Sequence, residues 1–226
     1  MSDSPFTISA RMRETGGEIT PQRAEMRRLA QAARLVIERL VATEAPAEVL
    51  AEAAGALEGA AALLEGYGQH RLYEGFAESA NAGDPHAHFD HSPIFGKANP
   101  LAPPLELGVQ DGKVVGSARF GSAYEGPPGA VHGGYVAAAF DEVLGMAQSM
   151  SGKHGMTGTL TVRYRKPTPL HTDLRFEGEL VGVEGRKIFT TGRVFGDGEL
   201  RAEADAVFIS VDFSKIAEMM GRRERS

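Results

Sequence analysis

A glycine-rich turn that runs directly into a helical pattern is the first candidate for chemistry. The turn reads Gly126-Pro-Pro-Gly-Ala-Val-His-Gly-Gly134, and the apolar-rich stretch from Tyr135 to about Met150 is predicted to be helical. The first turn of a helix offers N–H groups without intrahelical partners and a partial positive charge, and glycines let a ligand come close. Such a turn can bind an anion or polarise a carbonyl oxygen. The simpler alternative is a tight turn that only needs positive φ angles.

A carboxylate inside the predicted helix favours the catalytic interpretation. Asp141 stands in the run Val136-Ala-Ala-Ala-Phe-Asp-Glu-Val-Leu-Gly-Met-Ala147, whose other members are mostly small or apolar. A carboxylate among apolar residues is costly unless it is solvated, paired or used. Glu142 lies about 100° further round the helix and is expected to be the exposed member of the pair. A solvated position for Asp141 at the helix edge is the alternative.

A second cluster has the spacing of a metal site. The segment His86-Ala-His-Phe-Asp90-His91 reproduces the H-x-H-x-D-H pattern that binds zinc in metallo-β-lactamase-like hydrolases. There the ligands follow a buried strand, whereas the residues before His86 are polar and include Gly83 and Pro85. No convincing downstream set of His and Asp completes such a site. We therefore expect a chance pattern and no metal, with a zinc hydrolase using His86, His88, Asp90 and His91 as the alternative.

The N-terminal part of the chain carries two helical patterns. Thr20-Pro21 is a helix start signal, and a second helix is expected from Pro46 to about Gly66. The first helix has one apolar stripe at three- and four-residue steps: Met26, Leu29, Ala30, Ala33, Val36, Ile37, Leu40 and Val41. Its arginines leave a DNA-reading helix-turn-helix as an alternative, but Glu25 and Glu38 dilute them. The pattern favours a helical hairpin that docks or packs in a dimer.

From Leu105 the apolar period changes to two, which is typical of strands. Strands are expected at 105–109, 113–120, 157–166, 172–183, 187–195 and 199–213, with Asp-Gly or Glu-Gly turns at 111–112, 184–185 and 197–198. Strands, one helix and a meander indicate an α+β domain with a helix laid against an antiparallel sheet. The expected division is a helical extension (1–75), an irregular linker or covering loop (76–104), the sheet domain (105–213) and a polar tail (214–226).

Composition excludes several classes of protein. The chain has 226 residues, 24 Lys+Arg against 30 Asp+Glu, and a net charge of −6, which disfavours a globally basic nucleic-acid binder. The absence of Cys removes disulfides, thiolate nucleophiles and sulfur-ligated zinc. No apolar run is long enough to span a bilayer, and the N-terminus lacks the order of a signal peptide. We expect a soluble cytoplasmic protein with no nucleic-acid or membrane partner.

Residues 126–213 resemble the hotdog-fold acyl-CoA thioesterases of the PaaI type, including their mitochondrial relatives. The order and spacing agree over five stretches: Val131–Tyr135, Phe140–Gly145, Met156–Thr159, Tyr164–Leu170 and Glu184–Lys187. The resemblance implies a long helix wrapped by an antiparallel sheet, in a homodimer whose sheets join or a homotetramer. It also implies hydrolysis of acyl-CoA to a carboxylic acid and CoA, with CoA as part of the substrate and no separate cofactor. Residues 1–75 lie outside the resemblance.

The resemblance also implies roles for particular residues. The amide of Gly133, with neighbouring helix N–H groups such as that of Gly134, binds the thioester carbonyl, and His132 shapes the turn or touches the thioester. Asp141 is the general base or the nucleophile, and Thr157 orients water or the carboxylate. Basic residues meet the CoA phosphates: Arg186 and Lys187, and also Arg165 or Lys166. A thioester lacks amide resonance, so one carboxylate and an oxyanion site can suffice.

Helix geometry adds that the site is shared between subunits. Gly133 and Asp141 are eight residues apart, which is about 12 Å along a helix, so one chain cannot bring both to one thioester. Two-fold symmetry can bring Asp141 of one subunit towards Gly133 of the other. The main rival from another class is a non-catalytic acyl-CoA sensor whose N-terminal hairpin contacts DNA or a partner. A hotdog-fold hydratase fits the placement of aspartate and glycine less well.

Overall fold

The computed structural model describes residues 20–67, 90–103, 105–153 and 155–211. Three helices lie in this part of the chain: α2 (Pro21–Val41), α3 (Ala47–Glu65) and α6 (Gly133–Ser149). The strands are β1 (Glu106–Gln110), β2 (Lys113–Ala118), β3 (Gly155–Tyr164), β4 (Leu174–Glu184), β5 (Lys187–Gly196) and β6 (Glu199–Ser210). One 3₁₀ turn, η1 (Ser122–Tyr124), precedes α6 and was not expected from the sequence.

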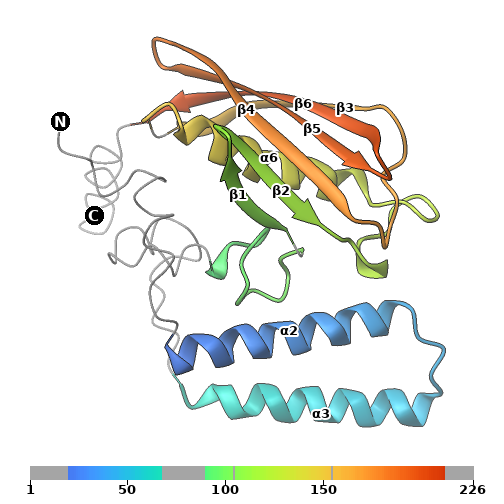
Figure 1. Cartoon of the computed structure of the whole chain (residues 1–226). Helices are drawn as coiled ribbons and strands as arrows, with labels where there is room; N and C mark the ends of the chain where they lie inside the picture. The colour runs from blue at the N-terminus through green and yellow to red at the C-terminus, as the bar shows by residue number, and fades with distance from the viewer. Residues whose placement is uncertain (1–19, 68–89, 104, 154, 212–226) are drawn as a thin grey trace, which may run out of the picture.

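The six strands form one antiparallel sheet in the order β1-β2-β4-β5-β6-β3. The hairpin turns close at Asp-Gly pairs with positive φ, 50° and 75° at Asp111-Gly112 and 53° and 74° at Asp197-Gly198. Helix α6 lies against one face of this curved sheet (Figure 1). The sheet and its single wrapped helix confirm the hotdog fold, and β1 and β3 are its two edges.

The core lies between α6 and the sheet. Its helical side consists of Val136, Ala139, Phe140, Val143, Leu144 and Ala147, all buried. The ring of Phe140 meets that of Phe176 on β4 edge-on at 5.6 Å. Gly178 and Gly192 face each other on β4 and β5 under the helix, and a Cβ on Gly178 would lie 2.7 Å from Val143 Cγ1. This glycine pair lets α6 approach closely, and each large buried side chain contributes roughly 1.5–3 kcal/mol, so the core fixes the helix against the sheet.

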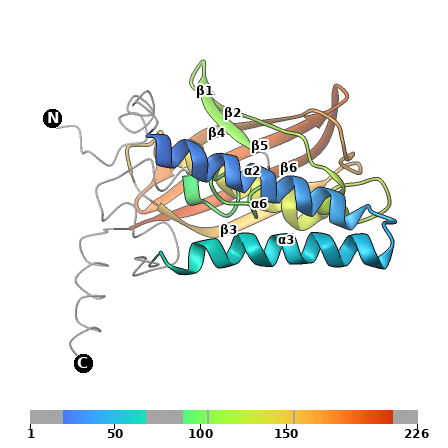
Figure 2. The same cartoon turned by 90° about the horizontal axis from the view of Figure 1, so that it is seen from below.

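Helices α2 and α3 form the predicted hairpin, on the side of α6 that faces away from the sheet (Figures 1 and 2). Thr20 caps α2 by accepting a hydrogen bond from the Arg23 N–H, and Pro21 stands in the first turn. Of the predicted apolar stripe on α2 only Ala30 is buried, and α3 buries none of its described side chains. The stripe therefore does not face the core.

Helix α2 is instead held by its polar side chains. The guanidinium groups of Arg23 and Arg27 each lie 2.7 Å from the carboxylate of Asp90, which is 2% exposed. Arg34 donates to the backbone carbonyls of residues 97 and 99. These arginines, which a DNA-reading interpretation would have pointed outward, bind the segment 90–103 within the same chain.

The other end of α2 is held at η1. The carboxylate of Glu38 accepts hydrogen bonds from the backbone N–H groups of Ser122 at 2.7 Å and Ala123 at 3.1 Å. These two bonds hold the pKa of Glu38 below its usual range despite the opposing effect of burial. Between the two attachment points, Ile94 and Phe95 of the segment 90–103 pack against the core. The described part of the expected linker or covering loop is thus a packed layer between α2 and the sheet domain.

Candidate active site

The first turn of α6 leaves one backbone N–H available. His132 is the N-cap residue, and its Nδ1 accepts a hydrogen bond of 3.0 Å from the N–H of Gly134. The Tyr135 N–H donates to the backbone oxygen of His132. No acceptor among the described residues takes the N–H of Gly133. The Gly133 amide is therefore the donor that this helix end can offer to a ligand, with the helix dipole behind it.

The same bond fixes the tautomer of His132. A neutral imidazole that accepts at Nδ1 carries its proton at Nε2. Protonation of Nδ1 would remove the acceptor and release the Gly134 N–H. His132 thus shapes the turn through its acceptor nitrogen and presents a donor on its exposed side.

Asp141 lies two turns further along α6 and is held by strand β3. The hydroxyl of Thr157 donates to Asp141 Oδ1 at 2.8 Å. Both side chains remain reachable from solvent, since Asp141 is half-buried and Thr157 exposed. One carboxylate oxygen is thereby oriented, and the other has no partner among the described hydrogen bonds. This leaves Asp141 placed to accept a proton from a water molecule.

Tyr164, at the other end of β3, is a site residue that sequence reasoning did not assign a role. Its hydroxyl donates a 2.7 Å hydrogen bond to the backbone oxygen of Gly133, and its ring lies 3.3 Å from where a Cβ of Gly133 would be. The side chain is 53% exposed, so it borders the open surface beside the Gly133 amide. Tyr164 appeared in the sequence only as part of a matching stretch.

A β-bulge puts Thr157 and Tyr164 on the same face of β3. They are seven residues apart, and an odd separation places two side chains on opposite faces of a regular strand. The pairing of β3 with β6 shifts by one residue between Thr157 and Thr159. The extra residue, Gly158, restores the common face, so both hydroxyls reach α6.

Glu142 corrects an expectation. It is not the exposed member of the carboxylate pair: its side chain is half-buried and turned towards Ser92, whose hydroxyl lies 3.5 Å from Glu142 Oε1. Burial, and then the charge of Asp141, raise the pKa of Glu142 to about 7. The segment 90–103 covers this side of α6, which the helical pattern alone could not reveal.

The four basic residues proposed for CoA lie in two places. Arg165 and Lys166 form ion pairs of 2.8 Å with Glu203 and Glu199. Glu203 alternates with the buried Ala202 and Ala204, so its pair with Arg165 is on the solvent-facing side of the sheet, away from α6. The structure does not bring these two residues to Asp141.

Arg186 and Lys187 lie at the turn between β4 and β5. The Arg186 guanidinium donates to the backbone oxygen of Ser210, whose register partner is Gly155 at the start of β3. This turn is therefore at the same end of β3 as Thr157. Lys187 is exposed there.

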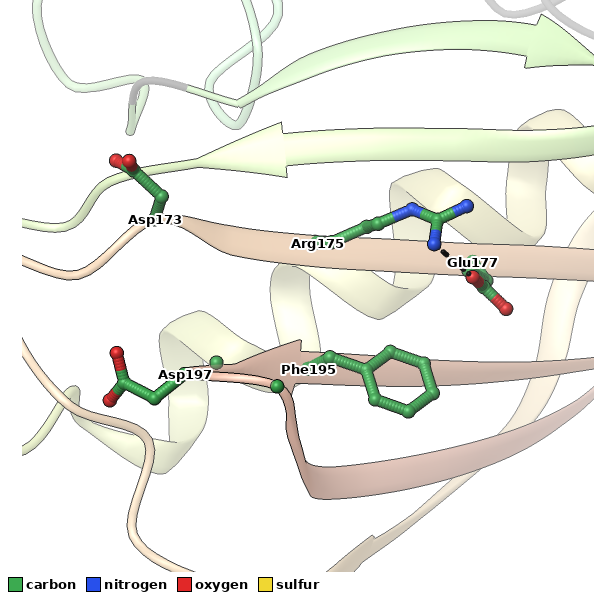
Figure 3. Close-up of a pocket in the computed structure, with 7 residues that line it drawn as sticks. Asp173, Arg175, Glu177, Phe195 and Asp197 are labelled. Atoms are coloured by element: carbon green, nitrogen blue, oxygen red, sulfur yellow. Dashed lines mark ion pairs between the residues drawn. The ribbon is translucent and has the colours of Figure 1, made fainter.

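A cavity of about 320 Å³ elsewhere on the sheet is not the site. It lies on the solvent-facing side of β4 and β5, lined by Asp173, Arg175, Glu177, Phe195 and Asp197 (Figure 3). Arg175 and Glu177 pair with each other at 3.0 Å across its wall. Asp141 and Gly133 do not line it.

The expected chance origin of the zinc-like pattern stays a prediction, because His86 and His88 lie outside the described residues. Asp90 is neutralised by Arg23 and Arg27 of α2. Within the described ranges no three His, Asp or Glu side chains gather as they would around a metal ion. Among the helices in those ranges, none is long and apolar enough to cross a bilayer.

Comparisons with known proteins place the chain in a family. A family model described as the thioesterase superfamily matches residues 128–203. Acyl-coenzyme A thioesterase THEM4 of Xenopus laevis is 37% identical over 93 residues, which make up 40% of this chain and 42% of that protein. The protein of the same name from Rattus norvegicus is 37% identical over 93 residues, 40% of each chain. The chain thus spans about two-fifths of the length of the curated relatives it matches.

One solved structure resembles most of the chain. It is the crystal structure of a thioesterase superfamily protein whose sequence is 36% identical to this chain, with a TM-score of 0.71. The match covers 81% of this chain and 94% of the other chain. Residues 105–226 are little more than half of the chain, so this likeness extends into the segments that precede the sheet domain. With the hotdog fold, the motif order and this likeness in agreement, the chain belongs to the thioesterase superfamily.

Proposed function

We propose that the protein hydrolyses acyl-CoA thioesters. The observation that carries the proposal is the pair of features on α6: a free Gly133 N–H at its positive end, and an Asp141 carboxylate oriented by Thr157. The curated relatives are named acyl-coenzyme A thioesterases, and the match to them covers this region of the chain. Membership of the PaaI type is part of the same proposal.

In the proposed reaction, Asp141 takes a proton from water as the water oxygen attacks the thioester carbonyl carbon. Negative charge develops on the carbonyl oxygen, which accepts a hydrogen bond from the Gly133 N–H. The carbon–sulfur bond then breaks, the carboxylic acid forms, and the CoA sulfur leaves and takes up the proton held by Asp141. Attack by Asp141 itself on the carbonyl carbon is the alternative, in which water hydrolyses the resulting anhydride.

The two groups of one site come from two subunits in this proposal. Gly133 and Asp141 are separated by eight residues of one straight helix, about 12 Å along its axis. Strand β3 is an edge of the sheet, so its outer backbone groups can pair with β3 of a second copy. When two β3 edges pair antiparallel about a two-fold axis, the two α6 helices lie side by side and run in opposite directions. Asp141 of one subunit then lies towards Gly133 of the other.

Arg186 and Lys187 are the proposed contacts to the CoA phosphates. They are exposed at the end of the sheet where Thr157 begins the site. Arg165 and Lys166 are weaker candidates, because acidic partners already hold their charges. Phosphate groups favour such local basic positions even on a protein of net negative charge.

The test is release of free CoA thiol from a panel of short, long and aryl acyl-CoAs, for the wild type and Asp141→Asn. The substitution keeps the shape but removes the base, so turnover should fall by roughly 10²–10⁴. Thermal unfolding should be unchanged, which separates lost chemistry from lost folding. Near wild-type turnover by Asp141→Asn contradicts the assignment. Tight binding of acyl-CoA without thiol release from any substrate would favour the sensor.

A further inference from the structure

Among the described residues, the hairpin of α2 and α3 carries most of the large apolar side chains that are exposed. Twelve of the nineteen exposed large apolar side chains in the described part of the chain lie between residues 26 and 67. They are Met26, Leu29, Leu35, Val36, Leu40, Val41, Val49, Leu50, Leu57, Leu63, Leu64 and Tyr67. Large apolar side chains that gather exposed on one pair of helices indicate an interaction surface. Leu35 does not belong to the apolar stripe of α2, so we call the other eleven side chains the hairpin face.

The charges beside the hairpin face restrict what can cover it. Every charged residue of α3 is acidic, namely Glu48, Glu52, Glu58 and Glu65. Anionic lipid surfaces and nucleic acids would be repelled by this row. On the exposed side of α2, Arg28 already pairs with Glu25 at 2.7 Å, whereas Arg39 has no ion pair among the described residues and gives the end of α2 a charge opposite to that of α3. A second hairpin of the same sequence can therefore set its α3 against this α2, and the reverse.

The position of the hairpin suits such a contact. Figure 2 shows α3 displaced from α2 towards the β3 edge of the sheet and away from β1. The proposed two-fold axis runs beside that same β3 edge. A partner chain paired there would have its own α3 displaced towards the axis as well, so the two hairpins would approach each other.

We propose that the hairpin face packs against the hairpin face of a second copy, as a four-helix contact across the axis that pairs the β3 edges. The contact is isologous, so each copy gives and receives the same side chains. This inference rests on the two-fold dimer of the proposed function. It adds a second interface, built by the N-terminal extension, that holds the two half-sites together.

The test uses the purified full-length chain with a photo-crosslinking p-benzoylphenylalanine placed at Leu57 or at Leu64. The matched control carries the crosslinker at Val109, which is about as exposed, 45% against 47% for Leu57, and lies on β1 at the opposite edge. After irradiation, the two hairpin variants should give a band of twice the chain mass on a denaturing gel. The crosslinked peptide should lie within residues 21–65 of the other copy, and the Val109 control should give no such band.

Other results overturn the inference. Links confined to one chain, including links to its own residues 212–226, would mean that the chain covers the face itself. No link at all, or a link to the sheet domain of the partner, would mean that the hairpins do not meet. Thioester hydrolysis is measured on the same samples without irradiation. A crosslink without hydrolysis supports the hairpin contact and refutes the proposed function. Hydrolysis without the crosslink supports the proposed function and refutes the hairpin contact.

Discussion

Two hydroxyl groups of β3 hold the two reactive points of α6. Thr157 orients the Asp141 carboxylate, and Tyr164 binds the carbonyl of Gly133. The Gly133 carbonyl shares its peptide plane with the Gly134 N–H, so the bond to Tyr164 restrains the backbone on the C-terminal side of the Gly133 N–H, where two successive glycines provide no side chain to do so. Tyr164 is in this view a positioning residue for the oxyanion donor.

Tyr164→Phe tests that view, because it removes only the hydroxyl. We expect kcat to fall about tenfold with KM little changed, since the donor acts on the developing oxyanion more than on the bound thioester. Tyr124→Phe is the control, because its hydroxyl donates to the backbone oxygen of Ala102 at 3.4 Å and not to a group of α6. Equal kcat values for Tyr164→Phe and the wild type would show that the hydroxyl does not position the donor.

Glu142 predicts a dependence of stability on pH. Because its pKa is raised to about 7 in the folded protein, the unfolded chain loses this proton at lower pH than the folded one. The free energy of unfolding should therefore decrease as the pH rises from about 4.5 to 7, by at most about 3 kcal/mol. Glu142→Gln should become progressively more stable than the wild type over that window, as measured by urea unfolding at several pH values. A stability difference independent of pH would contradict the raised pKa.

At the scale of elements, α2 differs from α6 in how it is attached. Helix α6 is held by a buried apolar face, whereas α2 is held by charged groups at Asp90 and Glu38. A buried carboxylate between two arginines fixes where the helix docks, because any other position would leave a buried charge without its partner. The hairpin is thus attached at defined points rather than over a continuous apolar surface.

Asp90→Asn should therefore destabilise the docking of α2. Two half-buried guanidinium groups lose their counter-charge, and we expect a loss of about 2–4 kcal/mol in the free energy of unfolding. Hydrogen exchange should accelerate in α2 before the sheet. Asp173→Asn is the control, because its ion pair with Arg119 is largely exposed and its loss should cost under about 1 kcal/mol. Equal costs for the two variants would mean that Asp90 does not anchor the helix.

The sequence predicted those features whose causes are local. Asp-Gly pairs predicted the hairpin turns, Thr20-Pro21 predicted the start of α2, and alternation predicted the strands, so an α+β domain with one helix against an antiparallel sheet followed from the residues. The hotdog fold itself was expected from the family resemblance. The roles of Tyr164 and Glu142 were not predicted. One depends on a bulge that shifts register by one residue, and the other on a covering segment some fifty positions earlier in the chain. The docking of α2 depends on the pair of Arg27 and Asp90, which are 63 residues apart, and a hydrophobic pattern along the sequence cannot predict such a contact.

The proposal for the whole molecule is that activity belongs to the dimer. If one subunit supplies Gly133 and the other Asp141, two inactive variants can complement each other. Asp141→Asn retains the donor, and Gly133→Val retains the base but places a side chain against the Tyr164 ring. An equal mixture, refolded together, should contain about half mixed dimers with one intact site each, giving about a quarter of wild-type activity.

The control for this mixture pairs Asp141→Asn with Thr157→Val. Both changes fall at the same end of the site, so mixed dimers contain no intact site and should show no gain over the parents. Recovery in the first mixture alone supports the shared site. No recovery in verified mixed dimers would contradict it.

The attachment of α2 also bears on the order in which the chain acquires its structure during synthesis. The first described helix depends on groups made much later, since Arg27 is 63 residues before Asp90 and Glu38 is 84 residues before Ser122. While the ribosome extends the chain, α2 and α3 emerge with exposed apolar side chains, and Arg23 and Arg27 of α2 do not yet have Asp90 as their partner. Helix α2 is thus made well before the groups that secure it, and until those groups emerge its apolar side chains would be available to chaperones.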